Sequence, residues 1–139
     1  MTNISLAQSY LIKAKKRLKI LAVLIAESDY SDVVREAQEI VELALKGMLR
    51  HVGIEPPKWH DVSGLLLSSR ERFSEEVVGR LPRLAEISGW LRKEREFSFY
   101  GDIDFIPTEE YTHEDARRAA DDAEFVVSTA ELVIRNEPQ

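Results

Sequence analysis

Apolar residues recur at the three- and four-residue spacing of an α-helix along most of the chain. The first stripe, with lysines mostly between its members, predicts a helix over roughly 4–27. A second stripe follows Ser28, Asp29 and Ser31, any of which can cap a helix, and it ends at Gly53. The first stripe is Ala7, Tyr10, Leu11, Ala14, Leu18, Leu21, Ala22 and Ile25, and the second is Val34, Ala37, Val41, Ala44, Leu45, Met48 and Val52.

The second half of the chain contains shorter helical signals. Pro56 and Pro57 cannot continue the second helix, and Asp61 is the predicted N-cap of a short helix around Leu65–Leu67. A further helix is expected to begin near Leu81–Pro82, since proline is accepted in a first turn. Its apolar stripe is Leu84, Ile87 and Leu91.

The C-terminal part begins with residues 103–107, which we interpret as an irregular loop. Thr112–Asp115 then resembles a capping box and starts the last helix, which frays towards Pro138. The buried stripe of this helix is rich in alanine, so we expect it to approach its neighbours closely; its members are Ala116, Ala119, Ala123, Val126, Ala130 and Val133. No period-two pattern indicates a strand.

These elements predict an all-α fold, an up-and-down antiparallel bundle of about five helices in a single domain over residues 1–139. The short connections make successive helices antiparallel neighbours. Each amphipathic helix can then bury its stripe against the next one.

Composition narrows the chemistry. The chain has no cysteine, which removes thiolate metal sites and Cys nucleophiles and fits a reducing compartment, so we expect a cytoplasmic protein. His51, His60 and His113 lie on separate elements without the spacing of a helical metal pair, and we expect neither a metal nor a cofactor. No apolar run approaches the roughly 18 residues that span a membrane.

The charge is uneven along the chain. Residues 1–101 carry 16 basic and 14 acidic side chains, whereas residues 102–139 carry 3 and 11, which together give the net charge of −6. A basic run, Lys13, Lys15, Lys16, Arg17 and Lys19, could meet phosphates or an acidic partner, although most runs of this kind are simply solvated helix faces.

One position breaks the apolar pattern. Continuing the stripe of Leu84, Ile87 and Leu91 by one turn reaches Arg95, which predicts a guanidinium on the apolar face. Arg95 then lines a cleft that binds a carboxylate or phosphate, pairs with a glutamate of a neighbouring helix, or extends to solvent from the edge of the stripe. Arg95 and Tyr100 could together face one cleft.

The residues after Arg95 include three aromatic side chains and a glycine. We interpret Phe97 and Phe99 as core residues that plug the end of the helix, and Tyr100 as a residue whose hydroxyl needs a polar partner or solvent. Gly101 is expected to end the helix with a positive φ.

Four segments together resemble the HEPN domains (higher eukaryotes and prokaryotes nucleotide-binding), in particular the small prokaryotic members. They are AQSYLIKAKKRLKIL, DYSDVVREAQEIVELALKGMLRHVGIEPPKWHDVSGLLL, LRKEREFSFYGD and YTHEDARRAADDAEFVV. The second segment is the most specific, because it combines a helix, a Gly-Pro turn and a His-Asp restart. The resemblance implies a helical bundle that forms a homodimer, with a cleft between the subunits at the ends of their fourth helices.

The resemblance also implies functional residues. The ribonuclease branch of the family has an arginine, a polar residue and, a few positions later, a histidine that often follows a tyrosine by two. Here Arg95, Glu96 and Tyr100 match, but the histidine position holds Asp102. Imidazole titrates near neutrality and can transfer protons, whereas an ordinary Asp cannot protonate a leaving group.

The sequence therefore favours a protein that is not an enzyme: a dimeric HEPN module that binds a nucleotide or a separate nucleotidyltransferase chain, as in a toxin–antitoxin pair. Arg95 and Tyr100 are its predicted ligand-binding residues, and the resemblance implies that such a partner can add adenylate groups to Tyr100. The alternative is a metal-independent ribonuclease toxin that uses Arg95, Glu96, Tyr100 and Asp102. A third hypothesis is that the bundle has only a structural role.

Overall fold

The computed structural model describes residues 2–58 and 62–134, with the side chains of residues 2–5 and of Glu96 left outside the description. Within these ranges the chain is helical and has no strand, which confirms the predicted all-α class. The predicted cap Asp61, together with His60 and Pro138, lies outside the described residues. The elements are α1 (Thr2–Ala26), α2 (Tyr30–His51), α3 (Val62–Ser68), the 3₁₀ turn η1 (Arg70–Arg72), α4 (Glu75–Val78), α5 (Leu81–Phe99), α6 (Pro107–Glu110) and α7 (His113–Ile134).

Local sequence signals set most of the helix ends. Gly53 follows α2 with φ +85°, as expected of a glycine that ends a helix. Thr112 and Asp115 form a reciprocal capping box: the Asp115 amide donates to Thr112 Oγ1 at 3.1 Å, and the Thr112 amide donates to Asp115 Oδ2 at 2.9 Å. Asp29 occupies the N-cap position of α2, but its side chain accepts no capping hydrogen bond.

Two short helices stand where the sequence predicts none. Ser74 caps α4 by accepting a hydrogen bond from the Val77 amide at 3.4 Å. Proline at the first position of α6 starts a single turn directly after the irregular residues 103–106. Both helices are four residues long, too short for a periodic stripe to reveal them.

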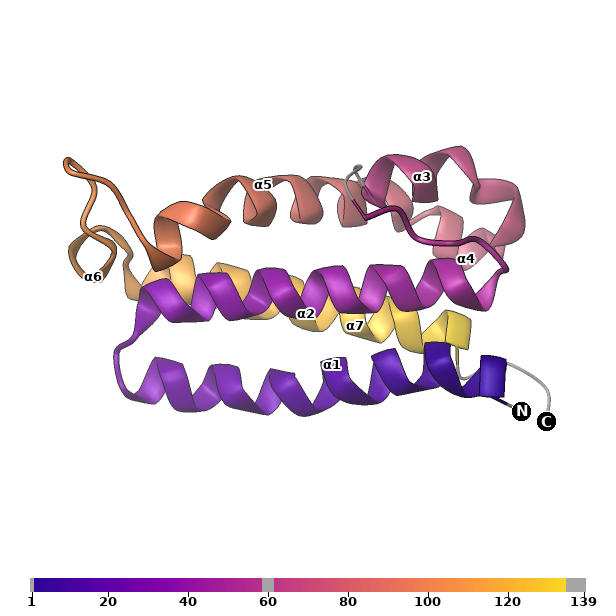
Figure 1. The fold of residues 1–139 in the computed structure, drawn as a ribbon, viewed down its shortest axis with the longest axis horizontal. Coiled ribbons are helices and arrows are strands. Elements are labelled where there is room, and N and C mark those ends of the chain that lie inside the picture. The colour runs from indigo at the N-terminus through magenta and orange to yellow at the C-terminus, as the bar shows by residue number, and fades with distance from the viewer. Residues whose placement is uncertain (1, 59–61, 135–139) are drawn as a thin grey trace.

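Helix α2 is the centre of the bundle. It lies between α1 and α5, and α7 packs along its remaining side (Figure 1). The predicted stripes of α2, α5 and α7 are almost entirely buried, and alanines at 116, 119, 123 and 130 let α7 pack closely on α2. Ala22 is exposed, so its assignment to the apolar stripe of α1 was wrong. No helix in the described ranges has the length and apolar character needed to cross a membrane.

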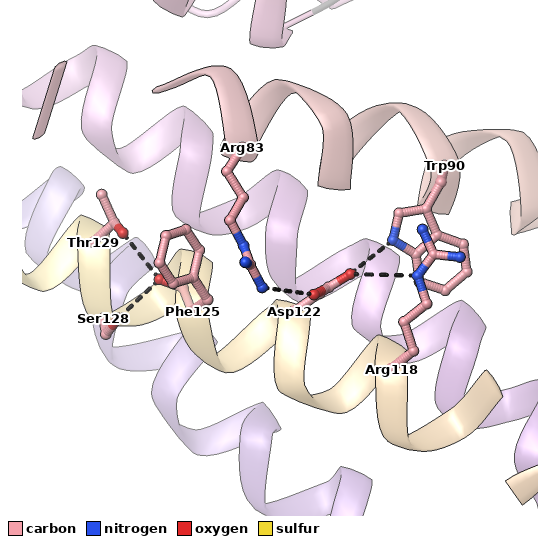
Figure 2. Close-up of polar contacts among 7 residues, drawn as sticks. All are labelled: Arg83, Trp90, Arg118, Asp122, Phe125, Ser128 and Thr129. Carbon is pink, nitrogen blue, oxygen red and sulfur yellow. Dashed lines mark hydrogen bonds and ion pairs between the residues drawn. The ribbon is translucent and has the colours of Figure 1, made fainter. Parts of the chain in front are cut away.

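Helices α5 and α7 approach each other little, and polar and aromatic side chains bridge the space between them (Figure 2). The buried carboxylate of Asp122 accepts a hydrogen bond from Trp90 Nε1 at 2.9 Å and lies 3.5 Å from Arg83 Nη2 and 3.9 Å from Arg118 Nε. The Arg118 guanidinium stacks 4.0 Å above the Trp90 ring, and that of Arg83 stacks 4.6 Å from the ring centre of Phe125. Asp122 therefore has partners on several sides and holds the two helices together.

We expect Asp122→Ala to lower the free energy of unfolding by about 1–3 kcal/mol, because the Trp90 indole N–H loses its acceptor and two arginines lose their carboxylate. Asp121→Ala is the matched control: its carboxylate is exposed and lies 3.9 Å from Arg117, so its removal should cost less than about 0.5 kcal/mol. Urea unfolding measures both. Equal losses for the two variants would contradict the bridging role of Asp122.

Candidate functional site

Arg95 lies on α5 one turn beyond the buried stripe of that helix. Its side chain is 52% exposed, and its Nη2 lies 3.5 Å from Glu39 Oε2 on α2. The predicted pairing with a glutamate of a neighbouring helix is therefore present. Because about half of the side chain is exposed and the guanidinium has five N–H donors, Arg95 retains donors for a further partner.

The same arginine lines a pocket between α2 and α5. The pocket has a volume of about 280 Å³ and is bounded by both helices, by the turn after α2 and by the start of α3. Three cationic residues contribute to it, with one acidic and two polar residues. The lining residues are Gln38, Val41, Glu42, Leu45, Pro57, Lys58, Val62, Ser88, Leu91, Arg92 and Arg95. A concave site with convergent polar groups is the usual form of a small-molecule site.

One wall of the pocket contains a chain of polar contacts along α2. Lys46 Nζ lies 2.9 Å from Glu42 Oε2, and Gln38 Nε2 donates to Glu42 Oε1 at 2.9 Å. Burial alone would raise the pKa of Glu42, but the hydrogen bonds from Lys46 and Gln38 and the charges of Lys46 and Arg95 outweigh it, so the pKa lies below its usual value. Glu42 is therefore an ionised acceptor at neutral pH.

Gln38 is the functional candidate that the sequence reasoning missed. Its side chain is 3% exposed, and its Oε1 has no hydrogen-bond partner among the described residues. A signal was present in the sequence, because position 38 lies on the face of α2 that carries Val34, Val41 and Leu45. A polar residue within an apolar stripe is the same kind of exception that drew attention to Arg95.

The sequence predicted that the aromatic residues at the end of α5 plug the core. This prediction was wrong. Phe97 is 42% exposed and Phe99 is 47% exposed, whereas Ser98 between them is 1% exposed, so the serine and not the phenylalanines faces the interior in this turn. Phe99 packs edge-on against Tyr100, with ring centres 4.7 Å apart. The Arg35 guanidinium lies 4.2 Å from the centre of the Phe99 ring. Tyr100 itself is 77% exposed, so its side chain is accessible to solvent.

The chain then turns sharply at Gly101. Its φ is +72°, which confirms the predicted helix stop, and an added Cβ would lie 2.4 Å from the Phe105 carbonyl oxygen. Asp102 and Phe105 exchange backbone hydrogen bonds of 2.9 and 3.0 Å across this turn. The Asp102 carboxylate accepts the Ile103 amide at 2.7 Å, so one of its oxygens is engaged in holding the turn.

Contacts between aromatic rings attach this segment to α5. Phe105 packs against Phe97 and Tyr111, with ring centres 5.4 and 5.6 Å away. Tyr111 donates its hydroxyl to Glu94 Oε1 at 2.8 Å. Burial, together with Glu94, raises the pKa of Tyr111, so the hydroxyl remains a donor at neutral pH. The connection from α5 to α6 extends past the end of the bundle (Figure 1).

The predicted site residues thus fall in two places. Arg95 lines the pocket, whereas Tyr100 and Asp102 lie on the exposed turn and are not among the described residues that line it. Glu96 belongs to α5, and its side chain is outside the described part.

The described histidines lie away from this pocket. His51 ends α2 and lines a different cavity together with Arg72 and Phe73. His113 starts α7 and packs edge-on against Tyr30, with ring centres 5.5 Å apart. Among the described residues, no three His, Asp or Glu side chains gather as a metal site would require.

Comparison with known proteins agrees with this architecture. The family model of the HEPN domain matches residues 7–133. A protein of Methanocaldococcus jannaschii, named "Putative toxin MJ1304", is 29% identical over 132 residues, which is 90% of this chain and 86% of that protein. The crystal structure of TT1696 from Thermus thermophilus has the same fold with a TM-score of 0.71 at 24% identity, covering 91% of this chain and 96% of that one. This chain belongs to the HEPN domain family.

Proposed function

We propose that this protein is a dimeric HEPN module of a toxin–antitoxin-type pair that binds a nucleotide at the α2–α5 pocket and lacks ribonuclease activity. Arg95 supplies the phosphate contact. The observation that carries the proposal is the half-exposed Arg95 guanidinium at a pocket that also contains Lys58 and Arg92. The name of the Methanocaldococcus relative supports a role as a toxin component.

Asp102 supports the absence of ribonuclease chemistry. Metal-free cleavage of RNA needs a group that accepts the 2′-hydroxyl proton and a group that protonates the leaving oxygen. Asp102 stands where the ribonuclease branch has histidine, and its carboxylate accepts the Ile103 amide. A carboxylate would also repel the phosphates of RNA.

The partner in this proposal is a separate nucleotidyltransferase chain, with Tyr100 as the acceptor of adenylate groups. The 77% exposure of Tyr100 supports this role, because an enzyme could reach the hydroxyl. Tyr100→Phe lacks that oxygen and should take up no adenylate when mass spectrometry follows the reaction.

The alternative is a metal-independent ribonuclease toxin that uses Arg95 of both subunits, with Tyr100 or Asp102 in place of histidine. The toxin name of the relative is the observation that favours it. The two readings differ in whether the protein cuts RNA.

The homodimer is supported by an apolar surface at the end of α5, the α5-end patch, which consists of Phe97, Phe99, Ile103 and Ile106. Light scattering should return twice the 15.9 kDa mass of one chain at micromolar concentration. Ile103→Asp, at a side chain that is 91% exposed, should give monomers, whereas the control Ile12→Asp on α1 should leave the dimer intact. A monomeric wild-type protein would exclude the dimer, and a dimer that Ile103→Asp leaves intact would exclude this patch.

Arg95→Ala tests the phosphate contact. Because it removes a charge-assisted donor set worth about 1.5–3 kcal/mol, it should weaken the binding of AMP roughly tenfold to a hundredfold. The free energy of unfolding should fall by less than about 1 kcal/mol, since the Glu39 ion pair is exposed. The control is Arg117→Ala, whose side chain is 57% exposed and pairs with Asp121 at 3.9 Å.

Isothermal titration calorimetry and thermal melts separate the outcomes. Unchanged AMP affinity combined with a large loss of stability would show that Arg95 is structural.

RNA cleavage distinguishes the proposal from its alternative. Without metal, the wild-type protein should cut single-stranded and structured RNA at background rate, because Arg95 stabilises phosphate charge but transfers no proton. Asp102→His should introduce cleavage that a second change, Arg95→Ala, abolishes. Gel analysis of labelled RNA provides the measurement. Strong cleavage by the wild-type protein that Arg95→Ala removes would establish the ribonuclease instead.

A further inference from the structure

Gln38 occupies a position in α2 where an apolar residue would serve packing better. It lies among the buried residues of α2 and is itself 3% exposed, yet it forms part of the pocket wall. Burying an amide is costly unless its donors and acceptor find partners. The partners of Gln38 therefore decide whether it belongs to the core or to a site.

The orientation of the Gln38 amide is fixed by its neighbour. Glu42 is ionised and held by Lys46, and an ionised carboxylate only accepts hydrogen bonds. The Gln38 NH₂ group must therefore face Glu42, as its 2.9 Å contact shows, and the oxygen must face away. An amide flip would place two oxygens against each other.

In this orientation of the amide, Gln38 Oε1 has no hydrogen-bond partner among the described residues. A buried acceptor in this state is unfavourable relative to one that receives a hydrogen bond. A partner that completes it must bring an N–H or O–H group into the pocket. Inorganic phosphate alone, bound at the cationic side chains, has no reason to prefer this pocket over other exposed arginines.

The cationic residues lie on the outer part of the same pocket. The side chains of Lys58, Arg92 and Arg95 are exposed, whereas Gln38 and Ser88 are buried. The pocket therefore has cationic side chains at its rim and the buried amide of Gln38 in its inner wall. Its volume of about 280 Å³ lies just below the range of about 300–1,000 Å³ that is usual for small-molecule sites, so it suits one nucleotide better than an extended chain.

We propose that Gln38 is a specificity-determining residue, which accepts a hydrogen bond from a ribose hydroxyl or base amino group of a nucleoside monophosphate whose phosphate lies at Arg95. This inference rests on the proposed nucleotide binding and adds the residue that distinguishes a nucleotide from a simple anion. Arg95 provides attraction for any phosphate, and Gln38 provides the preference for a phosphate ester whose nucleoside carries N–H or O–H donors.

The first test varies the ligand on the wild-type protein. Calorimetry should give a dissociation constant for AMP at least tenfold lower than that for inorganic phosphate. Ribose 5-phosphate identifies the donor: an affinity close to that of AMP assigns it to the ribose, and an affinity close to that of phosphate assigns it to the base. Equal affinities for AMP and inorganic phosphate would overturn the inference.

The second test varies the protein. Gln38→Met has similar length and no polar atoms, so it should weaken AMP binding roughly tenfold and leave phosphate binding unchanged. Its melting temperature should equal or exceed that of the wild type, because the unpartnered oxygen is gone. Gln8→Met on α1 is the matched control and should behave as wild type in both measurements.

The outcomes separate this inference from the proposed function. If Arg95→Ala weakens AMP binding but Gln38→Met does not, the proposed function stands and the role of Gln38 is wrong. If Gln38→Met lowers the melting temperature without changing AMP binding, Gln38 is structural. If the wild-type protein binds neither AMP nor phosphate, both proposals fail.

Discussion

The packing of α2 against three other helices is the constraint on which the rest of the structure depends. More than half of its residues are buried, because α1, α5 and α7 all bury apolar surface against it. A polar side chain on such a helix has little solvent, so it must find a partner inside the protein or in a ligand. The Gln38–Glu42–Lys46 chain meets this requirement for every group except the Gln38 oxygen.

Polar residues that interrupt apolar stripes have different meanings at two places in the bundle. Asp122 interrupts the stripe of α7, but Trp90, Arg83 and Arg118 surround it, and its role as a bridge between helices needs nothing further. Gln38 interrupts the stripe of α2 and keeps one acceptor without a partner beside a pocket, among the residues that the structure describes. The two residues therefore differ in whether their buried oxygens have hydrogen-bond partners among the described residues.

Helical periodicity predicted the long helices, the stop at Gly101 and the exceptional position of Arg95, because each depends on residues close together in sequence. The partner of Arg95 could not be predicted, since Glu39 is brought to it only by the packing of α5 on α2. The core role predicted for Phe97 and Phe99 was wrong for a related reason, because the packing decides which face of the last turn of α5 points inward. Ser98 is buried in that turn, whereas both phenylalanines are exposed. Gln38 and Asp122 also interrupt apolar stripes, so periodicity marks their positions in the same way as that of Arg95.

A crystal structure of the protein grown with AMP tests the central claim most directly, since the claim assigns a place to both ends of the nucleotide. The account predicts phosphate oxygens within about 2.7–3.2 Å of the Arg95 guanidinium and a nucleoside N–H or O–H at the same distance from Gln38 Oε1. AMP bound at another surface, or bound in the pocket with the Gln38 oxygen still lacking a donor, would contradict it.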